Sequence, residues 1–208
     1  MSDVHTYSSD VAFTPAVKAI QARKGSREAY ARVEQQGWRT EVDEKLAALL
    51  ADANSFYFAT AAADGQPYIQ HRGGPKGFLR VLDKQTLAFA DYAGNQQFLT
   101  QGNLSENPKA YIFIMDYAHR RRVKIWGEAR VVEDDEALTT SLMPKGYRAR
   151  PEQVILFKIA AWDTNCPQHI PQKFDAPDVA AALAARDARI AELEAEVAAL
   201  KAEKAPGH

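Results

Sequence analysis

The sequence predicts a mainly β protein with flanking helices, in which a run of strands forms a closed barrel or a sandwich. Two observations carry this prediction: about seven strand-like segments follow one another, and most of them are joined by hairpin signals. Hydrophobic residues make up 46% and charged residues 25% of the 208 residues, as in ordinary globular proteins. We expect three parts: an N-terminal helical segment at 1–54, a barrel domain at 55–174 and a C-terminal helix at 175–208.

Two helices are expected before the strands. Residues 14–36 have Pro15 at the first helical position and a glycine after the last, and the polar run at 24–27 leaves room for a break. Residues 41–53 carry leucines at helical spacing, so their helix has one apolar face.

The strands are recognised by their apolar and β-branched residues between turn signals. Asp64-Gly65 is typical of a tight hairpin, and Asn107-Pro108 closes a short helix expected at 94–104. A second short helix is expected at 133–143. The strand segments are 55–60, 66–71, 78–82, 86–90, 110–116, 121–132 and 153–163. Closing such a sheet into a barrel removes its exposed edges.

The C-terminal helix differs from the rest of the chain in composition and charge. Residues 175–208 carry a formal charge of −3 and residues 1–174 carry +2. Leu183, Ile190 and Val197 are seven residues apart, and Leu193 and Leu200 follow the last two by three residues, which is an a/d heptad pattern. Two interpretations remain open: a parallel coiled-coil dimer, or one surface helix packed on its own domain.

The overall composition excludes several classes of protein. A net charge of −1 argues against bulk nucleic-acid binding, and no apolar run is long enough to span a bilayer. The N-terminus has no basic patch followed by an apolar core, and Cys166 is the only cysteine. We therefore expect a cytoplasmic protein with no nucleic-acid or membrane partner.

Three segments place cations beside chain-breaking residues, at 71–77, 119–124 and 166–174. Glycines let a backbone approach a ligand closely, and arginine side chains match phosphate oxygens. The three segments together favour a small anionic ligand held between strand ends, although each alone is also typical of a solvated turn. The segment from Gly94 to Gln97 opens the helix expected at 94–104, and a helix N-terminus attracts anions.

The order of these motifs resembles the pyridoxamine 5′-phosphate oxidase-like flavoproteins. The resemblance covers about 55–163 together with 166–174, and it is strongest at 60–72, 89–95 and 122–129. His71-Arg72-Gly73-Gly74-Pro75 and Cys166-Pro167-Gln168-His169-Ile170 are similar to a branch of uncharacterised members. The resemblance implies a split β-barrel that forms a homodimer and binds flavin mononucleotide (FMN) at the dimer interface.

The resemblance and the cationic segments together give a set of expected cofactor-binding residues. Family phosphate-binding positions fall near Arg72, Lys76 and 95–97, and a flavin-contacting position falls near Arg122. The full set is His71, Arg72, Gly73, Lys76, Asn95, Gln96, Gln97, Arg122, His169 and Lys173. Trp126 and Trp162 are alternatives for covering an aromatic ring, although tryptophans in a barrel are more often part of the core.

Two departures from the family bear on the activity. The oxidase has Ser-Arg-Lys where this chain has Asn95-Gln96-Gln97, so two phosphate-directed cations are missing. Its C-terminal arginine–histidine signature is also absent. We therefore expect an FMN-dependent oxidoreductase acting on another small molecule, not pyridoxamine phosphate oxidase activity.

Other interpretations stay open at this point. The alternative function is a flavin- or haem-binding storage or sensor protein without turnover. Cys166 and His169 have the spacing of half a zinc site, but nothing in the sequence brings further ligands to them, so no metal is expected. The residues give no catalytic acid–base pair, and the catalytic residues are unknown. The chemistry of a flavin belongs mostly to the cofactor.

Overall fold

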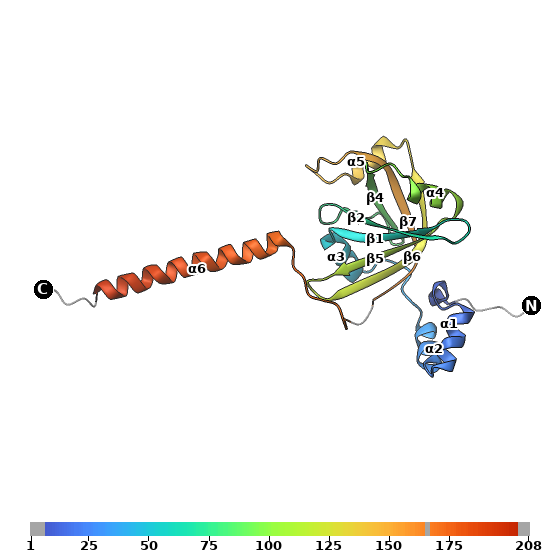
Figure 1. The fold of residues 1–208 in the computed structure, drawn as a ribbon, viewed down its shortest axis with the longest axis horizontal. Coiled ribbons are helices and arrows are strands. Elements are labelled where there is room, and N and C mark those ends of the chain that lie inside the picture. Colours follow the sequence, from blue (N-terminus) through green and yellow to red (C-terminus); the bar gives the residue numbers. More distant parts are fainter. Residues whose placement is uncertain (1–6, 165–166, 204–208) are drawn as a thin grey trace, which may run out of the picture. The chain divides into compact units, whose positions relative to one another are not determined.

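In the computed structural model, which describes residues 7–164 and 167–203, seven strands form one antiparallel sheet (Figure 1). Their order is β2-β1-β5-β6-β7-β4-β3. The strands are β1 Ser55–Ala61, β2 Pro67–Gly73, β3 Arg80–Val81, β4 Thr86–Tyr92, β5 Lys109–Asp116, β6 Arg121–Val132 and β7 Pro151–Thr164. The seven expected strands are thus confirmed, and the largest difference is that β3 is shorter than the segment 78–82.

The sheet is rolled up around one apolar core. Strands β5, β6 and β7 separate β1 from β4 in the sheet, yet Phe56 and Phe58 of β1 contact Phe89 of β4, with ring centroids 5.1 and 5.7 Å apart. Large aromatic side chains contribute most to a core of this kind. Burial of these rings therefore holds β1 and β4 close together. Strands β2 and β3 end the sheet without pairing with each other. The predicted class, mainly β with flanking helices and a split barrel, is confirmed. The closed barrel or sandwich expected from the hairpin pattern is wrong, because the sheet stays open between β2 and β3.

A bulge in the longest pair of strands bends the barrel wall. The register between β6 and β7 shifts between Trp126 and Gly127. A Cβ atom at Gly127 would lie 2.1 Å from the carbonyl oxygen of Lys158, so only glycine fits where the two backbones approach. Val123 and Ile125 face the core, and Trp126 faces outward and stacks on Trp38 at 4.8 Å.

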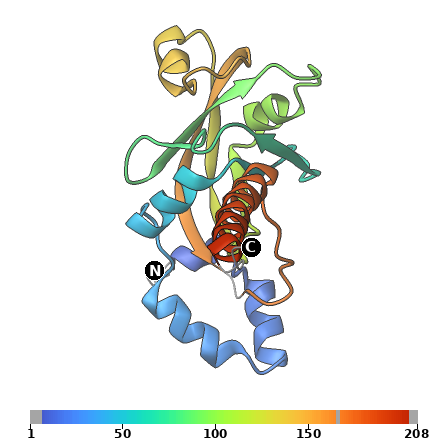
Figure 2. The same ribbon diagram turned by 90° about the vertical axis from the view of Figure 1, so that its left-hand side faces the viewer.

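The N-terminal helices differ from both expected ranges, 14–36 and 41–53. The expected helix at 14–36 is two helices, α1 Pro15–Arg23 and α2 Arg27–Gln36, after the short 3-10 helix Ser8–Val11. Figure 2 shows the two as separate helices, drawn in blue. The break falls at Gly25, whose φ of +78° is left-handed and ends α1. Helix α3, Glu44–Asp52, begins after Asp43, which caps it by accepting a hydrogen bond from the Leu46 amide at 2.8 Å.

Two short helices flank the strands later in the chain. Helix α4 is Leu99–Glu106 and helix α5 is Glu136–Leu142. The expected start of α4 near Gly94 was wrong by five residues. Gln96 and Phe98 have φ values of 58° and 52°, and such left-handed residues cannot continue a right-handed helix.

The chain divides into two compact units. The first comprises residues 1–116 and 121–168 and contains the barrel; the second comprises residues 117–120 and 169–208. In the second unit, the Gln172 side-chain amide donates to the Ala118 carbonyl at 2.7 Å, and helix α6 is Ala176–Glu203. Among the described helices, none combines the length and the apolarity needed to cross a membrane.

Candidate functional site

The open side of the sheet is bridged by polar side chains of β2 and β4. Tyr68, Gln70 and Arg72 alternate along β2 and point to the side of the sheet that carries the core. Arg72 forms an ion pair with Asp91 of β4, and the two side chains are only 12% and 11% exposed. Strands β2 and β4 are not neighbours in the sheet, and they contact each other through a charged pair, not through backbone hydrogen bonds.

Neutral side chains complete this bridge. The second guanidinium nitrogen of Arg72 donates to the Thr100 hydroxyl at 3.2 Å, and that hydroxyl donates to the side-chain oxygen Oε1 of Gln70 at 3.2 Å. The Gln153 amide of β7 donates to the other oxygen of Asp91 at 3.0 Å. Buried charges need such partners, because an unpaired charge in a core is strongly unfavourable.

Burial sets the electrostatics of the pair. It raises the pKa of the Asp91 carboxyl, although the charge of Arg72 and the Gln153 hydrogen bond act in the opposite direction. Burial likewise lowers the pKa of Arg72, opposed by the attraction of Asp91. Both shifts have the same cause, which is the loss of water around two ionic groups.

Two surface hollows meet at this pair. Both are lined by Gln70, Arg72, Asp91 and Tyr92, so the ion pair forms their common wall. The first hollow also includes the loop 94–98 and the start of α4; the second includes His71, Gly73 and Phe78. The lining of the first hollow is rich in amide and hydroxyl groups, which suits a polar ligand.

Two polar atoms at these hollows have no hydrogen-bond partner among the described residues. They are Nε of Arg72 and the hydroxyl of Tyr92, and both are buried. Such groups are uncommon in folded proteins, because each costs about 1–3 kcal/mol when it lacks a partner. An acceptor atom of a ligand in either hollow would satisfy them.

The sequence predicted that α4 starts near residue 94, but residues 94–98 form a loop, and this loop lines the first hollow. Asn95, Gln96 and Gln97 precede the helix instead of forming its first turn, and the Gln97 amide donates to the Asn95 side-chain oxygen at 3.3 Å. The expected helix N-terminal site at these three residues is therefore corrected to a loop. All three residues nevertheless line the hollow that Arg72 also lines.

The other expected site residues of the first unit lie elsewhere. Lys76 forms an ion pair with Asp52 of α3 at 2.9 Å. Strand register places Arg122 opposite Met115, on the outer face of the sheet, whereas Arg72 lies on the inner face opposite Phe56. Nε of Arg122 is buried and has no partner among the described residues.

The outer face that carries Arg122 is aromatic. Tyr57 lies between His71 and Phe113 in the strand register, and Tyr111 lies beside Trp126 with ring centroids 5.1 Å apart. Burial raises the pKa of the Tyr111 hydroxyl. Ile69 of β2, on the same face, is 60% exposed. A sheet face with exposed apolar residues of this size is typical of an interface.

Trp126 and Trp162, the two tryptophans considered for covering a ring, have structural partners. Trp162 is 2% exposed, and its indole nitrogen donates to the Glu41 carbonyl at 2.8 Å. Trp126 is stacked on Trp38, with Lys124 5.2 Å from its ring centroid. Trp162 is therefore part of the core, and Trp126 is part of the contact between the N-terminal segment and β6.

His169 and Lys173 belong to the second unit. His169 has a φ of 61°, and the Lys173 ammonium lies 4.6 Å from the centre of the Tyr117 ring. Cys166, the other member of the considered zinc half-site, lies outside the described residues. Among residues 7–164 and 167–203, no three His, Cys, Asp or Glu side chains are grouped as metal ligands.

The sequence prediction missed Asp91, Tyr92 and Gln153 as site residues. The signal was present, because Asp91 is the only charged residue in the strand Thr86–Tyr92, which is otherwise mostly apolar. A carboxylate in such a strand needs a buried cationic partner. Which arginine supplies that charge depends on the rolled sheet, since Arg72 and Asp91 are not on neighbouring strands.

Comparisons with known proteins agree with the architecture. Residues 42–166 match the sequence profile of the family described as pyridoxamine 5′-phosphate oxidase. The comparison with functionally curated proteins gave no match.

Solved structures with a similar fold share little sequence with this chain. HupZ of Group A Streptococcus is 18% identical, with a TM-score of 0.50 over 64% of this chain and 100% of HupZ. An FMN-binding protein from Syntrophomonas wolfei is 12% identical, with a TM-score of 0.49 over 70% of this chain and 97% of that protein. At 18% identity, the similarity to HupZ concerns the fold alone.

Proposed function

Because the chain belongs to the pyridoxamine 5′-phosphate oxidase family, we propose that it binds FMN beside the Arg72–Asp91 pair. The observation that carries the proposal is the pair of partnerless buried donors, Nε of Arg72 and the Tyr92 hydroxyl, at two adjoining hollows. When bound, FMN supplies a ring that accepts and releases electrons. The residues of the chain bind and orient it.

The donors around the first hollow fit a phosphate in part. Among the described residues, Arg72 is the only arginine or lysine that lines it; Asp91 already offsets part of its charge, and Glu152 is a second carboxylate in the lining. Asn95, Gln96 and Gln97 add neutral amide groups in place of the two cations found in the oxidase. Neutral donors stabilise a phosphate less than cations do, so the binding of FMN should depend strongly on Arg72.

A homodimer explains why the expected site residues lie on two faces of the sheet. In one protomer, Arg72 lies on the inner face and Arg122 on the outer face, so one small ligand does not reach both through the sheet. We propose that the aromatic outer face around Tyr57 and Phe113 packs against a second copy. Arg122 of one protomer would then join the ligand that lies in the hollow of its partner.

We further propose that the flavoprotein is an oxidoreductase acting on a small molecule, in the cytoplasm. The missing cations at 95–97 and the missing C-terminal signature argue against pyridoxamine phosphate as the substrate. Asp91, held by Arg72 and Gln153, positions the guanidinium and does not provide a free base. The protein therefore contributes binding and orientation, and no acid–base residue is assigned.

The test is the visible spectrum of the purified protein. We expect a flavin spectrum that is bleached by NADH or NADPH without air and restored by oxygen. The Arg72→Ala variant should lose the flavin on dilution, whereas Arg80→Ala, an exposed arginine of β3, should keep it.

Other spectra would lead to different conclusions. A bound flavin that no reductant turns over supports the storage or sensor alternative. A haem spectrum would mean that the bound cofactor is haem and not flavin. A colourless protein that takes up neither cofactor overturns the proposal.

A further inference from the structure

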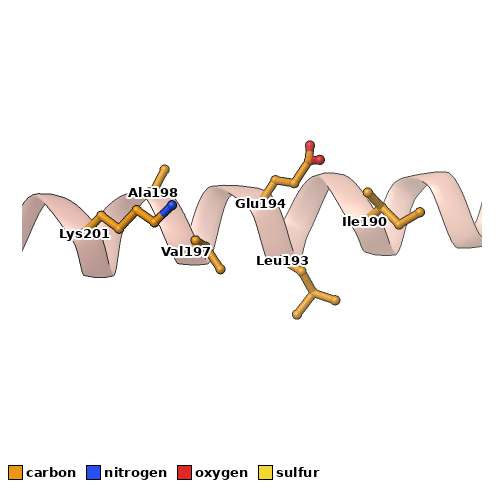
Figure 3. Close-up of a pocket in the computed structure, with 6 residues that line it drawn as sticks. All are labelled: Ile190, Leu193, Glu194, Val197, Ala198 and Lys201. Carbon is orange, nitrogen blue, oxygen red and sulfur yellow. The ribbon is translucent and has the colours of Figure 1, made fainter.

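Helix α6 carries an apolar stripe that no other described residue of the second unit covers. Leu183, Ile190, Leu193, Val197 and Leu200 are between 42% and 56% exposed. Figure 3 shows Ile190, Leu193 and Val197 along the helix, with Glu194 and Lys201 beside them. In proteins, most of the stability of a helix comes from packing its apolar face against another surface, so the stripe calls for a partner surface.

The identity of the apolar residues selects the kind of partner. In heptad notation, Ile190 and Val197 occupy a positions, and Leu193 and Leu200 occupy d positions. β-branched residues at a together with leucine at d favour two parallel strands over three or four. We propose that α6 pairs in parallel and in register with α6 of a second copy of this chain.

A shallow hollow on the helix surface has the composition that such a pairing needs. It is lined by Ile190, Leu193, Glu194 and Val197, and continues along Ala198 and Lys201. In a coiled coil, each core side chain inserts between four residues of the facing helix. The first four of these residues occupy successive a, d, e and a positions. In a parallel pair, such a group of four receives a d side chain of the facing helix, which is Leu193 of the partner subunit.

The charges that flank the stripe also specify the direction. Arg189 and Glu196 occupy g positions, and Glu194 and Lys201 occupy e positions. In the parallel pair, Arg189 faces Glu194 of the partner subunit and Glu196 faces Lys201 of the partner subunit, so both contacts are attractive. An antiparallel pair with Ile190 beside the partner subunit's Leu193 keeps one attractive contact, between Arg189 and the partner subunit's Glu196. It also places Glu194 near the partner subunit's Asp187, which repels, so the parallel pair has the better charge complementarity.

The paired segment is centred on the second half of the helix. Arg186 occupies the d position between Leu183 and Ile190, and a charged core position weakens that layer. Residues 190–200 therefore contribute most of the contact. This inference does not depend on the proposed function, because every residue that it uses belongs to α6.

The test uses the full chain in a Cys166→Ser background, so that one introduced cysteine is the only thiol. Leu193→Cys should form a disulfide-linked dimer under mild oxidation at least about tenfold faster than Ala195→Cys. Ala195 lies on the opposite side of the helix, at an f position, and is the matched control. Cysteines at d positions of a parallel pair face each other, whereas those at f positions do not.

A charge reversal checks the direction with the same measurement. Adding Lys201→Glu to the Leu193→Cys protein should slow disulfide formation by roughly two- to tenfold, and adding Glu196→Lys as well should restore it. Equal rates at 193 and 195 would overturn the pairing. Disulfides that form only after mixing Ile190→Cys protein with Leu193→Cys protein would overturn the parallel direction.

Discussion

Arg72 on β2 and Asp91 on β4 form a buried ion pair across the open side of the rolled sheet. The pair has two consequences. It connects two strands that the backbone hydrogen bonds leave unconnected, and it fixes the guanidinium at the wall shared by two hollows. The same arginine therefore has a structural partner and, through its free Nε, a remaining donor for a ligand.

Removing the carboxylate should destabilise the fold. Asp91→Leu leaves the Arg72 charge buried without its partner, and we expect a loss of about 3 kcal/mol in the free energy of unfolding. Chemical denaturation measures it. Asp52→Asn, which breaks the exposed pair with Lys76, is the control and should cost less than about 1 kcal/mol. The double variant Arg72→Met with Asp91→Leu should recover most of the loss, and a double variant as unstable as the single one would contradict this account.

Removing the cation should weaken flavin binding. Arg72→Ala takes away the only arginine or lysine found in the lining of the first hollow within residues 7–164 and 167–203, so we expect a large increase in the dissociation constant of FMN. Titration of flavin fluorescence gives this constant, and circular dichroism shows whether the variant is folded. Unchanged affinity in a well-folded variant would remove Arg72 from the binding site.

Deleting residues 177–208 should leave the flavin bound. The deleted segment belongs to the second unit, whereas both hollows belong to the first. Absorbance after gel filtration measures the bound flavin, and light scattering gives the oligomeric state. If the truncated protein becomes monomeric and also loses FMN, the C-terminal helix is needed to hold the site-forming dimer together.

Gly127→Ala should be strongly destabilising. Its Cβ would lie 2.1 Å from the Lys158 carbonyl oxygen, and neither backbone can move without breaking the bulge between β6 and β7. We expect a loss of at least about 2 kcal/mol in thermal or chemical unfolding. Gly102→Ala in α4 is the matched control, because no atom lies within 4 Å of its Cβ. That change should be neutral or stabilise the helix by up to about 1 kcal/mol.

The N-terminal helix pair should lose stability in acid. Burial favours the neutral form of Glu34, but Lys18 and Arg27 outweigh it and lower the pKa of the Glu34 carboxyl. A carboxyl with a lowered pKa stabilises the folded state above its unfolded pKa of about 4.3, and this contribution disappears as the pH falls through the folded value.

The test compares unfolding curves over the acid range. Glu34→Gln should be about 1–2 kcal/mol less stable near pH 7 and should lose less stability on acidification than the unchanged protein. Glu28→Gln, whose side chain is exposed on the same helix, should follow the unchanged protein. Parallel acid curves for Glu34→Gln and the unchanged protein would contradict the role of Glu34.

Local patterns were sufficient to predict the elements of the barrel. The hairpin at Asp64-Gly65 and the alternation along β6 are each encoded within a few residues, and the strands formed where expected. The loop before α4 was predicted wrongly, because Gln96 and Phe98 adopt left-handed backbone conformations that are uncommon for residues of their type.

The sequence by itself determined the strand number, the hairpin order, the family resemblance and the heptad pattern of α6, because these depend on residue type and spacing along the chain. Only the tertiary structure decided which charges meet. Asp91 contacts Arg72 because the packing of Phe56, Phe58 and Phe89 in the core curves the sheet and brings β2 toward β4. A cation that the sequence offers as a free phosphate ligand is therefore, in the fold, already partly neutralised by a carboxylate, and its buried Nε has no partner among the described residues.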